Sequence, residues 1–128
     1  MGYYITQGDT EILIKGVNHS SLIKKVKEFI KAGNEFDWAN NDVILKTFSI
    51  TELFDEICWE VKFNEQGDID TLGFVGEKLG SEDVFFDLIA EFVEDGSYIT
   101  IYGECADSWK YVFNNGKMKI LQGKTIYE

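Results

Sequence analysis

The chain has 128 residues, a formal net charge of -11 and a hydrophobic fraction of 45%. The high hydrophobic fraction excludes a disordered acidic tail, and the length predicts one folded domain over residues 1–128. Its basic residues are all lysine, so it has no guanidinium group to clamp phosphate or guanine, and we expect no direct nucleic-acid binding. No apolar run approaches the ~20 residues of a membrane span, and no signal-peptide pattern is present, so we expect a cytoplasmic protein without membrane contact.

The negative charge is concentrated in the middle of the chain. Residues 52–107 carry 16 acidic residues against two lysines, whereas residues 1–51 are neutral overall and residues 108–128 have a net charge of +3. An uneven charge distribution bears on binding partners more than on fold. A basic protein is therefore the partner that the composition favours.

The N-terminal residues predict a β-hairpin. Residues 2–6 and 10–17 are rich in residues that favour strands. The stretch Gln7-Gly8-Asp9 between them is typical of a turn. We therefore expect two short antiparallel strands at the start of the chain.

A helix and a short strand are predicted next. Residues 18–31 have apolar side chains at helical spacing. Ser20 or Ser21 is the expected N-cap of this helix, and Gly33 follows where a helix ends. After a loop, residues 42–48 predict a short strand.

The central part of the chain predicts a short helix followed by two strands. Ser49-Ile50-Thr51-Glu52 has the pattern of a capping box, which marks the start of a helix. Residues 59–63 alternate between apolar and polar side chains, as a half-buried strand does. Residues 64–67 are typical of a turn, and residues 68–75 predict the returning strand.

A second amphipathic helix is predicted after Ser81, which we expect as its N-cap, and Gly96 is its expected stop. Its apolar stripe consists of Val84, Phe85, Leu88, Ile89, Phe92 and Val93. A three-strand meander over residues 97–121 follows, with Asn115-Gly116 as a strong hairpin signal. The predicted fold is α+β, with a mainly antiparallel sheet, about three helices on one face and this C-terminal β-meander.

The C-terminal half contains five short stretches of turn and strand residues, at 76–80, 93–99, 103–104, 109–113 and 115–117. These stretches resemble those of small, mostly uncharacterised acidic α+β proteins of Gram-positive bacteria, their phages and other mobile elements. The resemblance covers residues 59–121. The resemblance implies a setting in which short acidic proteins often inhibit a host or rival protein. It implies no catalytic residues.

Candidate catalytic residues are few. His19 is the single histidine, and its neighbours Ser20 and Ser21 are interpreted as capping residues, because a catalytic triad needs side chains from separate elements. Cys58 and Cys105 form no CxxC motif, so we expect them to be buried apolar residues, with a disulfide or a reactive thiol as the alternatives. The cysteines and histidine are too few for a zinc site, and the acidic residues match no EF-hand spacing. We expect no catalytic residue, no metal site and no cofactor.

The second predicted helix carries a row of acidic residues, Asp83, Asp87 and Glu91, spaced four residues apart. A rise of ~1.5 Å per residue places successive carboxylates about 6 Å apart on one face, with no lysine nearby in the helix. Glu94 and Asp95 add negative charge beyond the row. This surface is either a solvated face or a recognition face for a basic partner, and its spacing is close to that of phosphates along a nucleic-acid strand.

The leading hypothesis is a non-enzymatic acidic binding protein that inhibits a basic nucleic-acid-processing protein, in an anti-defence role and as a nucleic-acid mimic. Its partner-binding residues would be Asp83, Asp87, Glu91, Glu94 and Asp95. One alternative is an immunity protein that neutralises a toxin. The other is a small enzyme or ligand-binding domain with Trp59, Trp109 and Tyr111 as a pocket wall, although the alternation of these residues favours the core.

Overall fold

The computed structural model describes residues 5–36, 39–76, 82–103 and 107–124. Its elements in chain order are β1 (Thr6–Glu11), η1 (Gly16–Asn18), α1 (His19–Lys31), α2 (Asn41–Lys46), α3 (Ile50–Glu56), β2 (Trp59–Phe63), β3 (Ile69–Phe74), α4 (Glu82–Ile89), η2 (Ala90–Phe92), β4 (Tyr98–Tyr102), β5 (Asp107–Asn114) and β6 (Lys117–Lys124). None of the helices in this described part combines the length and apolar character that a bilayer crossing needs.

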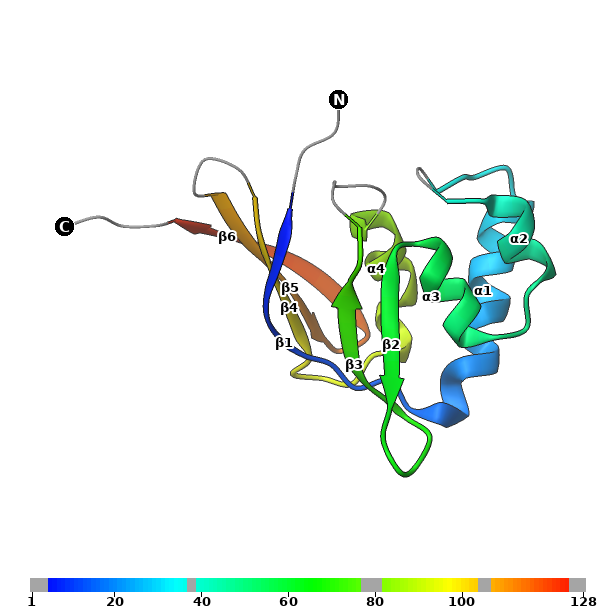
Figure 1. Cartoon of the computed structure of the whole chain (residues 1–128), viewed down its shortest axis with the longest axis horizontal. Helices are drawn as coiled ribbons and strands as arrows, with labels where there is room; N and C mark the ends of the chain where they lie inside the picture. The colour runs from blue at the N-terminus through cyan, green and yellow to red at the C-terminus, as the bar shows by residue number, and fades with distance from the viewer. Residues whose placement is uncertain (1–4, 37–38, 77–81, 104–106, 125–128) are drawn as a thin grey trace.

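The fold is α+β, as predicted. Within the described residues, a four-stranded antiparallel sheet has the order β1-β4-β5-β6, and β2 and β3 form a two-stranded sheet. In Figure 1, α4 and the β2–β3 hairpin lie between the four-stranded sheet and helices α1 to α3. The strands expected over 59–63 and 68–75 and the C-terminal meander are confirmed.

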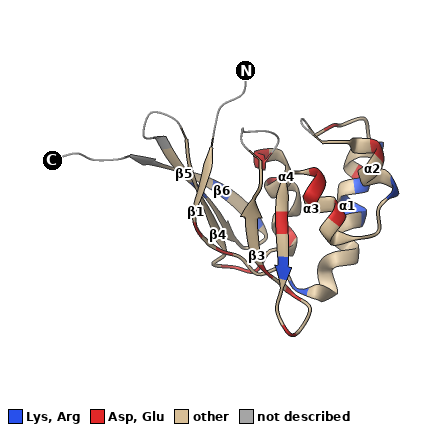
Figure 2. Cartoon of the chain, viewed as in Figure 1, with Lys and Arg blue, Asp and Glu red and all other residues tan. Residues whose placement is uncertain are grey.

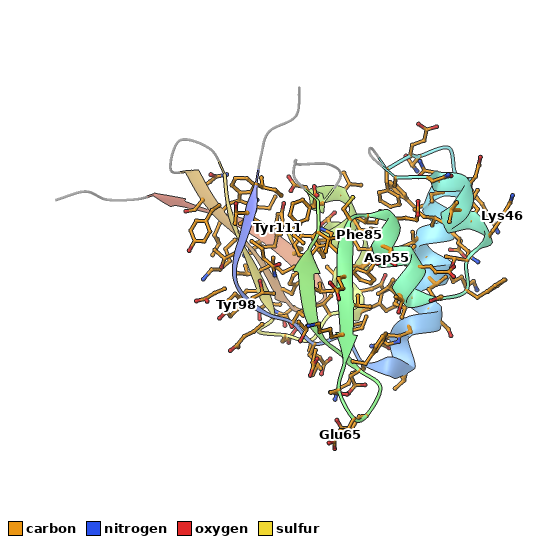
Figure 3. The ribbon with its side chains drawn as sticks, viewed as in Figure 1. Lys46, Asp55, Glu65, Phe85, Tyr98 and Tyr111 are labelled. Atoms are coloured by element: carbon orange, nitrogen blue, oxygen red, sulfur yellow. The ribbon has the colours of Figure 1, made fainter. Side chains whose placement is uncertain are left out.

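The core lies between the sheets and the helices, and aromatic rings fill its centre. Phe86 of α4 packs edge-on against Trp59 of β2 and lies beside Tyr111 and Phe113 of β5, at ring-centroid distances of 5.2, 5.6 and 6.2 Å. All four side chains are fully buried. Tyr111, labelled in Figure 3, lies toward the middle of the molecule. Phe86 therefore joins both sheets to α4 through one side chain.

Three predictions from local sequence signals are confirmed. Gly33 follows the end of α1 with a φ of +100°, which favours glycine. At the start of α3, the Ser49 side chain accepts a hydrogen bond from the Glu52 N–H, which confirms the predicted N-cap, while the Ser49 N–H donates to the Thr47 hydroxyl and not to Glu52 as a full capping box would have it. Asn115 and Gly116 have φ values of 55° and 73°, as a type I′ hairpin turn requires.

The predicted N-terminal hairpin is wrong, because β1 is one continuous strand. The stretch Gln7-Gly8-Asp9 forms a bulge, in which β1 has one more residue than β4 between its pairs with Ile101 and Ile99. A Cβ on Gly8 would collide with the ring of Tyr102, so glycine serves close packing there instead of a turn. Residues 2–4 of the expected first strand lie outside the described residues.

The strand predicted over 42–48 is also wrong, because α2 forms there. The Asn40 side chain accepts a hydrogen bond from the Val43 N–H and caps this helix. The buried Thr47 hydroxyl donates to the Glu52 carboxylate at 2.6 Å and links α2 to α3. The β-branched residues of this segment favour a strand, but the Asn40 cap, which the sequence prediction missed, starts a helix instead.

The two longer helices begin or end differently from the prediction. The N-cap of α1 is Asn18 and neither Ser20 nor Ser21, and Asn18 makes no side-chain capping bond. Helix α4 stops at Ile89 and is followed by the 3-10 turn η2, so the chain leaves the α-helix well before Gly96. Ser81, the expected N-cap of α4, lies outside the described residues.

Two contacts join β1 and the segment that follows it to the two-stranded sheet. The Gln7 side chain donates from Nε2 to the Leu72 carbonyl at 2.7 Å and accepts the Phe74 N–H at Oε1 at 2.8 Å. Further along, Ile14 and Ile69 exchange two main-chain hydrogen bonds of 2.9 Å. An amide side chain therefore takes the place of a main-chain ladder between β1 and β3.

Candidate partner-binding groove

An open groove of about 490 Å³ lies between α4, α1 and β6. It is lined by Phe29, Asp83, Val84, Asp87, Leu88, Met118 and Ile120. Val84 and Ile120 are 47% and 41% exposed, although Val84 belongs to the apolar stripe that the sequence predicted for this helix. The groove therefore combines exposed apolar surface with two carboxylates of the predicted acidic row.

The sheet beneath the groove holds Asp83 in place. Its carboxylate accepts a hydrogen bond from the hydroxyl of Tyr111, whose ring is buried in β5. Burial raises the pKa of Tyr111 and the hydrogen bond to Asp83 raises it further, while a hydrogen bond with the Trp109 side chain acts in the opposite direction. The phenol therefore remains a proton donor at neutral pH and positions Asp83 at the rim of the groove.

Replacing Tyr111 with phenylalanine is expected to lower the free energy of unfolding at pH 7 by about 1–2 kcal/mol, because a hydrogen bond to a carboxylate is lost while the buried ring remains. The raised pKa adds a pH dependence. Above about pH 10 the unfolded chain releases the Tyr111 proton and the folded chain keeps it, so stability falls as pH rises. Urea unfolding at pH 7 and about pH 10.5 measures both effects.

Asp83→Ala completes a double-mutant cycle with Y111F. The two changes should be less than additive, because either one removes the same hydrogen bond. Y111F should also lose less stability than the wild type between the two pH values. Additive losses together with an unchanged pH dependence would contradict the assigned hydrogen bond.

Asp87 is an exposed carboxylate of the groove. Its side chain is exposed and makes no hydrogen bond or ion pair with any residue in the described ranges. Figure 2 shows basic segments on α1 and β6 and acidic segments on α3 and α4. A cation brought by a partner would therefore meet in Asp87 a carboxylate that no contact among the described residues occupies.

Glu91, the third member of the predicted row, leaves the α-helix. It lies on η2 and forms an ion pair with Lys25 of α1, so its partner comes from another helix. The two side chains are 51% and 37% exposed, and pairs at this exposure contribute about 0–1 kcal/mol. Of the three residues in the predicted acidic row, only Asp83 and Asp87 therefore lie on the α-helix.

Glu94 and Asp95 lie in a second depression, of about 400 Å³, which Glu11 of β1 and Asp70 of β3 also line. Asp95 accepts a hydrogen bond from the Asn115 N–H at 2.8 Å and so supports the β5–β6 turn. The structure therefore separates the five predicted residues instead of gathering them on one face. Sequence reasoning missed Glu11 and Asp70, which come from distant strands.

The residues considered for catalysis or for the wall of a ligand pocket do not line the groove. The His19 ring packs at 5.9 Å from the ring of Phe63. Trp59 and Tyr111 have no exposed surface, so these rings belong to the core and do not form the wall of an open pocket. Trp109 is partly buried against the same core.

Cys58 is only half-buried, contrary to the expected burial. It follows α3 with a φ of 69°, in the left-handed region. Burial raises the pKa of its thiol, and the carboxylates of Glu82 and Glu56 raise it further, which keeps the thiol protonated and weakly nucleophilic at neutral pH. Cys105 lies outside the described residues.

Within the described ranges, no three His, Cys, Asp or Glu side chains are grouped as metal ligands would be.

Comparisons with family models, curated proteins and solved structures found no match to this chain. The resemblance of residues 59–121 to mobile-element proteins stays a prediction. The function is therefore inferred from the chemistry of the groove itself.

Proposed function

We propose that this protein is a non-enzymatic binding protein that inhibits a basic partner by covering a positively charged surface. The observation that carries the proposal is the groove, in which Asp83 and Asp87 adjoin exposed apolar side chains of α4 and β6. Tyr111 positions Asp83, and Asp87 has no partner among the described residues. Such a surface suits a partner segment that presents lysine or arginine beside aliphatic residues. The net charge of -11 favours fast association with that partner.

The class of partner that we propose is an enzyme that processes nucleic acids. Such enzymes bind the phosphate backbone through lysine and arginine, so their active surfaces are basic. An acidic chain without arginine is suited to contact the enzyme and not its nucleic acid. The apolar lining of the groove supports recognition of a protein segment over pure charge mimicry.

Asp87→Lys tests this proposal, because the carboxylate has no partner among the described residues and its reversal should leave the fold intact. The partner is first identified by copurification from the organism that encodes the chain. Binding of the purified partner is then measured by calorimetry at about 50 and 500 mM salt. We expect D87K to weaken binding by about tenfold or more at low salt, and high salt to weaken wild-type binding.

Glu65→Lys is the matched control, since it makes the same charge change at the exposed β2–β3 turn, labelled at the lower end of Figure 3. We expect its affinity to stay within about twofold of the wild type. Equal losses in both variants would show that only net charge matters. Unchanged binding by D87K would exclude the groove, and a copurified partner whose activity is not inhibited would reject the inhibitory role.

A further inference from the structure

β6 is an outer strand of the four-stranded sheet, and no strand of the described residues lies along its outer edge. Its residues remain accessible, since Ile120 and Leu121 are 41% and 51% exposed and Gln122 is also exposed. An edge strand presents a row of unpaired N–H and C=O groups, which is a template for another strand.

The hairpin register shows which residues of β6 face this edge. β5 and β6 pair around the Asn115-Gly116 turn, beginning with Asn114 opposite Lys117. In a two-residue hairpin the pair next to the turn is hydrogen bonded, and hydrogen-bonded and non-bonded pairs then alternate. Phe113 donates its N–H to the Ser97 carbonyl, on the β4 side, at 3.0 Å, which agrees with this alternation.

Met118, Ile120 and Gln122 therefore direct their main-chain N–H and C=O groups away from β5. No main-chain hydrogen bond outside the β5–β6 ladder involves these three residues within the described ranges. The side chains of Met118 and Ile120 lie opposite Phe113 and Tyr111 and line the groove. The free edge and the apolar groove are thus parts of one surface.

We propose that the partner binds by adding an extended segment to the outer edge of β6, so that every second side chain enters the groove. The inference rests on the proposed function and adds to it the mode of binding and the sequence pattern of the partner. An added strand lies about 4.8 Å from β6, and its main-chain hydrogen bonds supply affinity. Aliphatic side chains of the segment contact Val84 and Leu88, and basic ones reach Asp83 and Asp87.

Charge favours a basic partner segment over a second copy of this chain. Each copy has a formal net charge of -11. Two β6 strands paired about a two-fold axis would place two Asp83–Asp87 pairs on the same face of the joined sheet. Like charges oppose that association, whereas lysines of an added strand that enter the groove are attracted by Asp83 and Asp87. Lys117 and Lys119 of β6 have their side chains on the opposite face of the sheet, because side chains alternate along a strand, so partner residues on that face are neutral or acidic.

Amide hydrogen exchange followed by NMR tests the proposal. The probe is a synthetic peptide of about nine residues in which every second residue, on the face toward the groove, is valine and lysine in turn, and the residues between them are threonine. In the free protein, the amides of Lys119 and Leu121 should exchange slowly and those of Met118, Ile120 and Gln122 rapidly. We expect the peptide to slow exchange of the three outward amides by about tenfold or more. No slowing, or slowing spread evenly over the chain, would overturn the proposal.

Two N-methylated forms of the peptide provide the matched control. Each carries methyl groups on alternate amides, so each loses the hydrogen-bond donors of one edge and keeps those of the other. We expect one form to bind like the parent peptide and the other to bind about tenfold more weakly or worse. Equal behaviour of the two forms would show that pairing along one edge is not involved.

Gln122→Pro removes an outward N–H at an edge position, where a folded sheet tolerates proline, and Gln122→Ala keeps that N–H. We expect Q122P, folded by circular dichroism, to weaken binding of the peptide and of the purified partner by about tenfold, with Q122A unchanged. Partner binding that depends on Asp87 but not on Q122P would reject strand addition and leave the proposed function standing. A dimer in sedimentation, with the outward amides protected without peptide, would identify a second copy as the occupant and overturn the proposal.

Discussion

Phe86→Ala is expected to lower the free energy of unfolding by about 3–5 kcal/mol. The Phe86 side chain is fully buried and contacts Trp59 of one sheet and Tyr111 and Phe113 of the other. The cavity left by alanine cannot close unless α4 moves toward both sheets at once. The surrounding side chains therefore recover little of the packing energy that the ring supplied. Urea unfolding followed by circular dichroism and tryptophan fluorescence measures the change.

Phe48→Ala is the matched control, because the Phe48 side chain is 88% exposed. Its ring lies beneath the Lys27 ammonium, 3.9 Å from the ring centroid, and losing that contact costs about 0.5–1 kcal/mol at an exposed site. Similar losses in the two variants would contradict the central place of Phe86 in the core.

Gln7→Ala is expected to lower the free energy of unfolding by about 2–3 kcal/mol. The change removes the side-chain hydrogen bonds to the Leu72 carbonyl and the Phe74 N–H. Both main-chain groups then lack a protein partner where β1 meets β3. The measurement is urea unfolding together with amide exchange at Phe74, which should become faster in the variant.

Gln66→Ala removes the same amide group from the exposed β2–β3 turn and should change stability by less than about 0.5 kcal/mol. If Q7A unfolds at the same urea concentration as Q66A and the Phe74 amide exchanges as in the wild type, the side chain of Gln7 does not link the two sheets.

Some signals confined to a few neighbouring residues predicted the local structure correctly. Ser49 caps α3 through the Glu52 N–H, and Asn115-Gly116 turns the last hairpin, because cap and turn geometry depend on adjacent backbone angles. The same logic failed at Gln7-Gly8-Asp9, where a turn-like stretch lies inside a strand. There the packing of Tyr102 and the amide bridge to β3 decide the conformation, and both come from distant segments.

The burial pattern of α4 shows why its apolar stripe was misplaced. Phe85 packs edge-on against Phe54 of α3, at a ring-centroid distance of 5.1 Å, while the next residue, Phe86, packs against the sheets. A helix covered on two sides buries a wider arc than a one-sided amphipathic pattern allows. Val84, which belonged to the predicted stripe, is left facing the groove.

For the candidate site, composition indicated negative charge near Asp83 and Asp87 but not the apolar wall beside them. Met118 and Ile120 alternate with lysines in β6, a pattern that predicts one apolar face of a strand. That pattern does not reveal whether the face is covered. The exposure of Ile120 follows from β6 being an edge strand, which depends on the order of the strands in the sheet.

The sequence by itself determined the α+β class, the uneven charge, the Ser49 cap and the Asn115-Gly116 turn, because these depend on composition and on residues a few positions apart. Only the tertiary structure decided which carboxylates are available to a partner. Lys25 pairs with Glu91, Tyr111 holds Asp83 from β5, and Asp87 is exposed with no partner in the described part of the chain. Such pairings arise where elements distant in the chain pack together, and no local period specifies them.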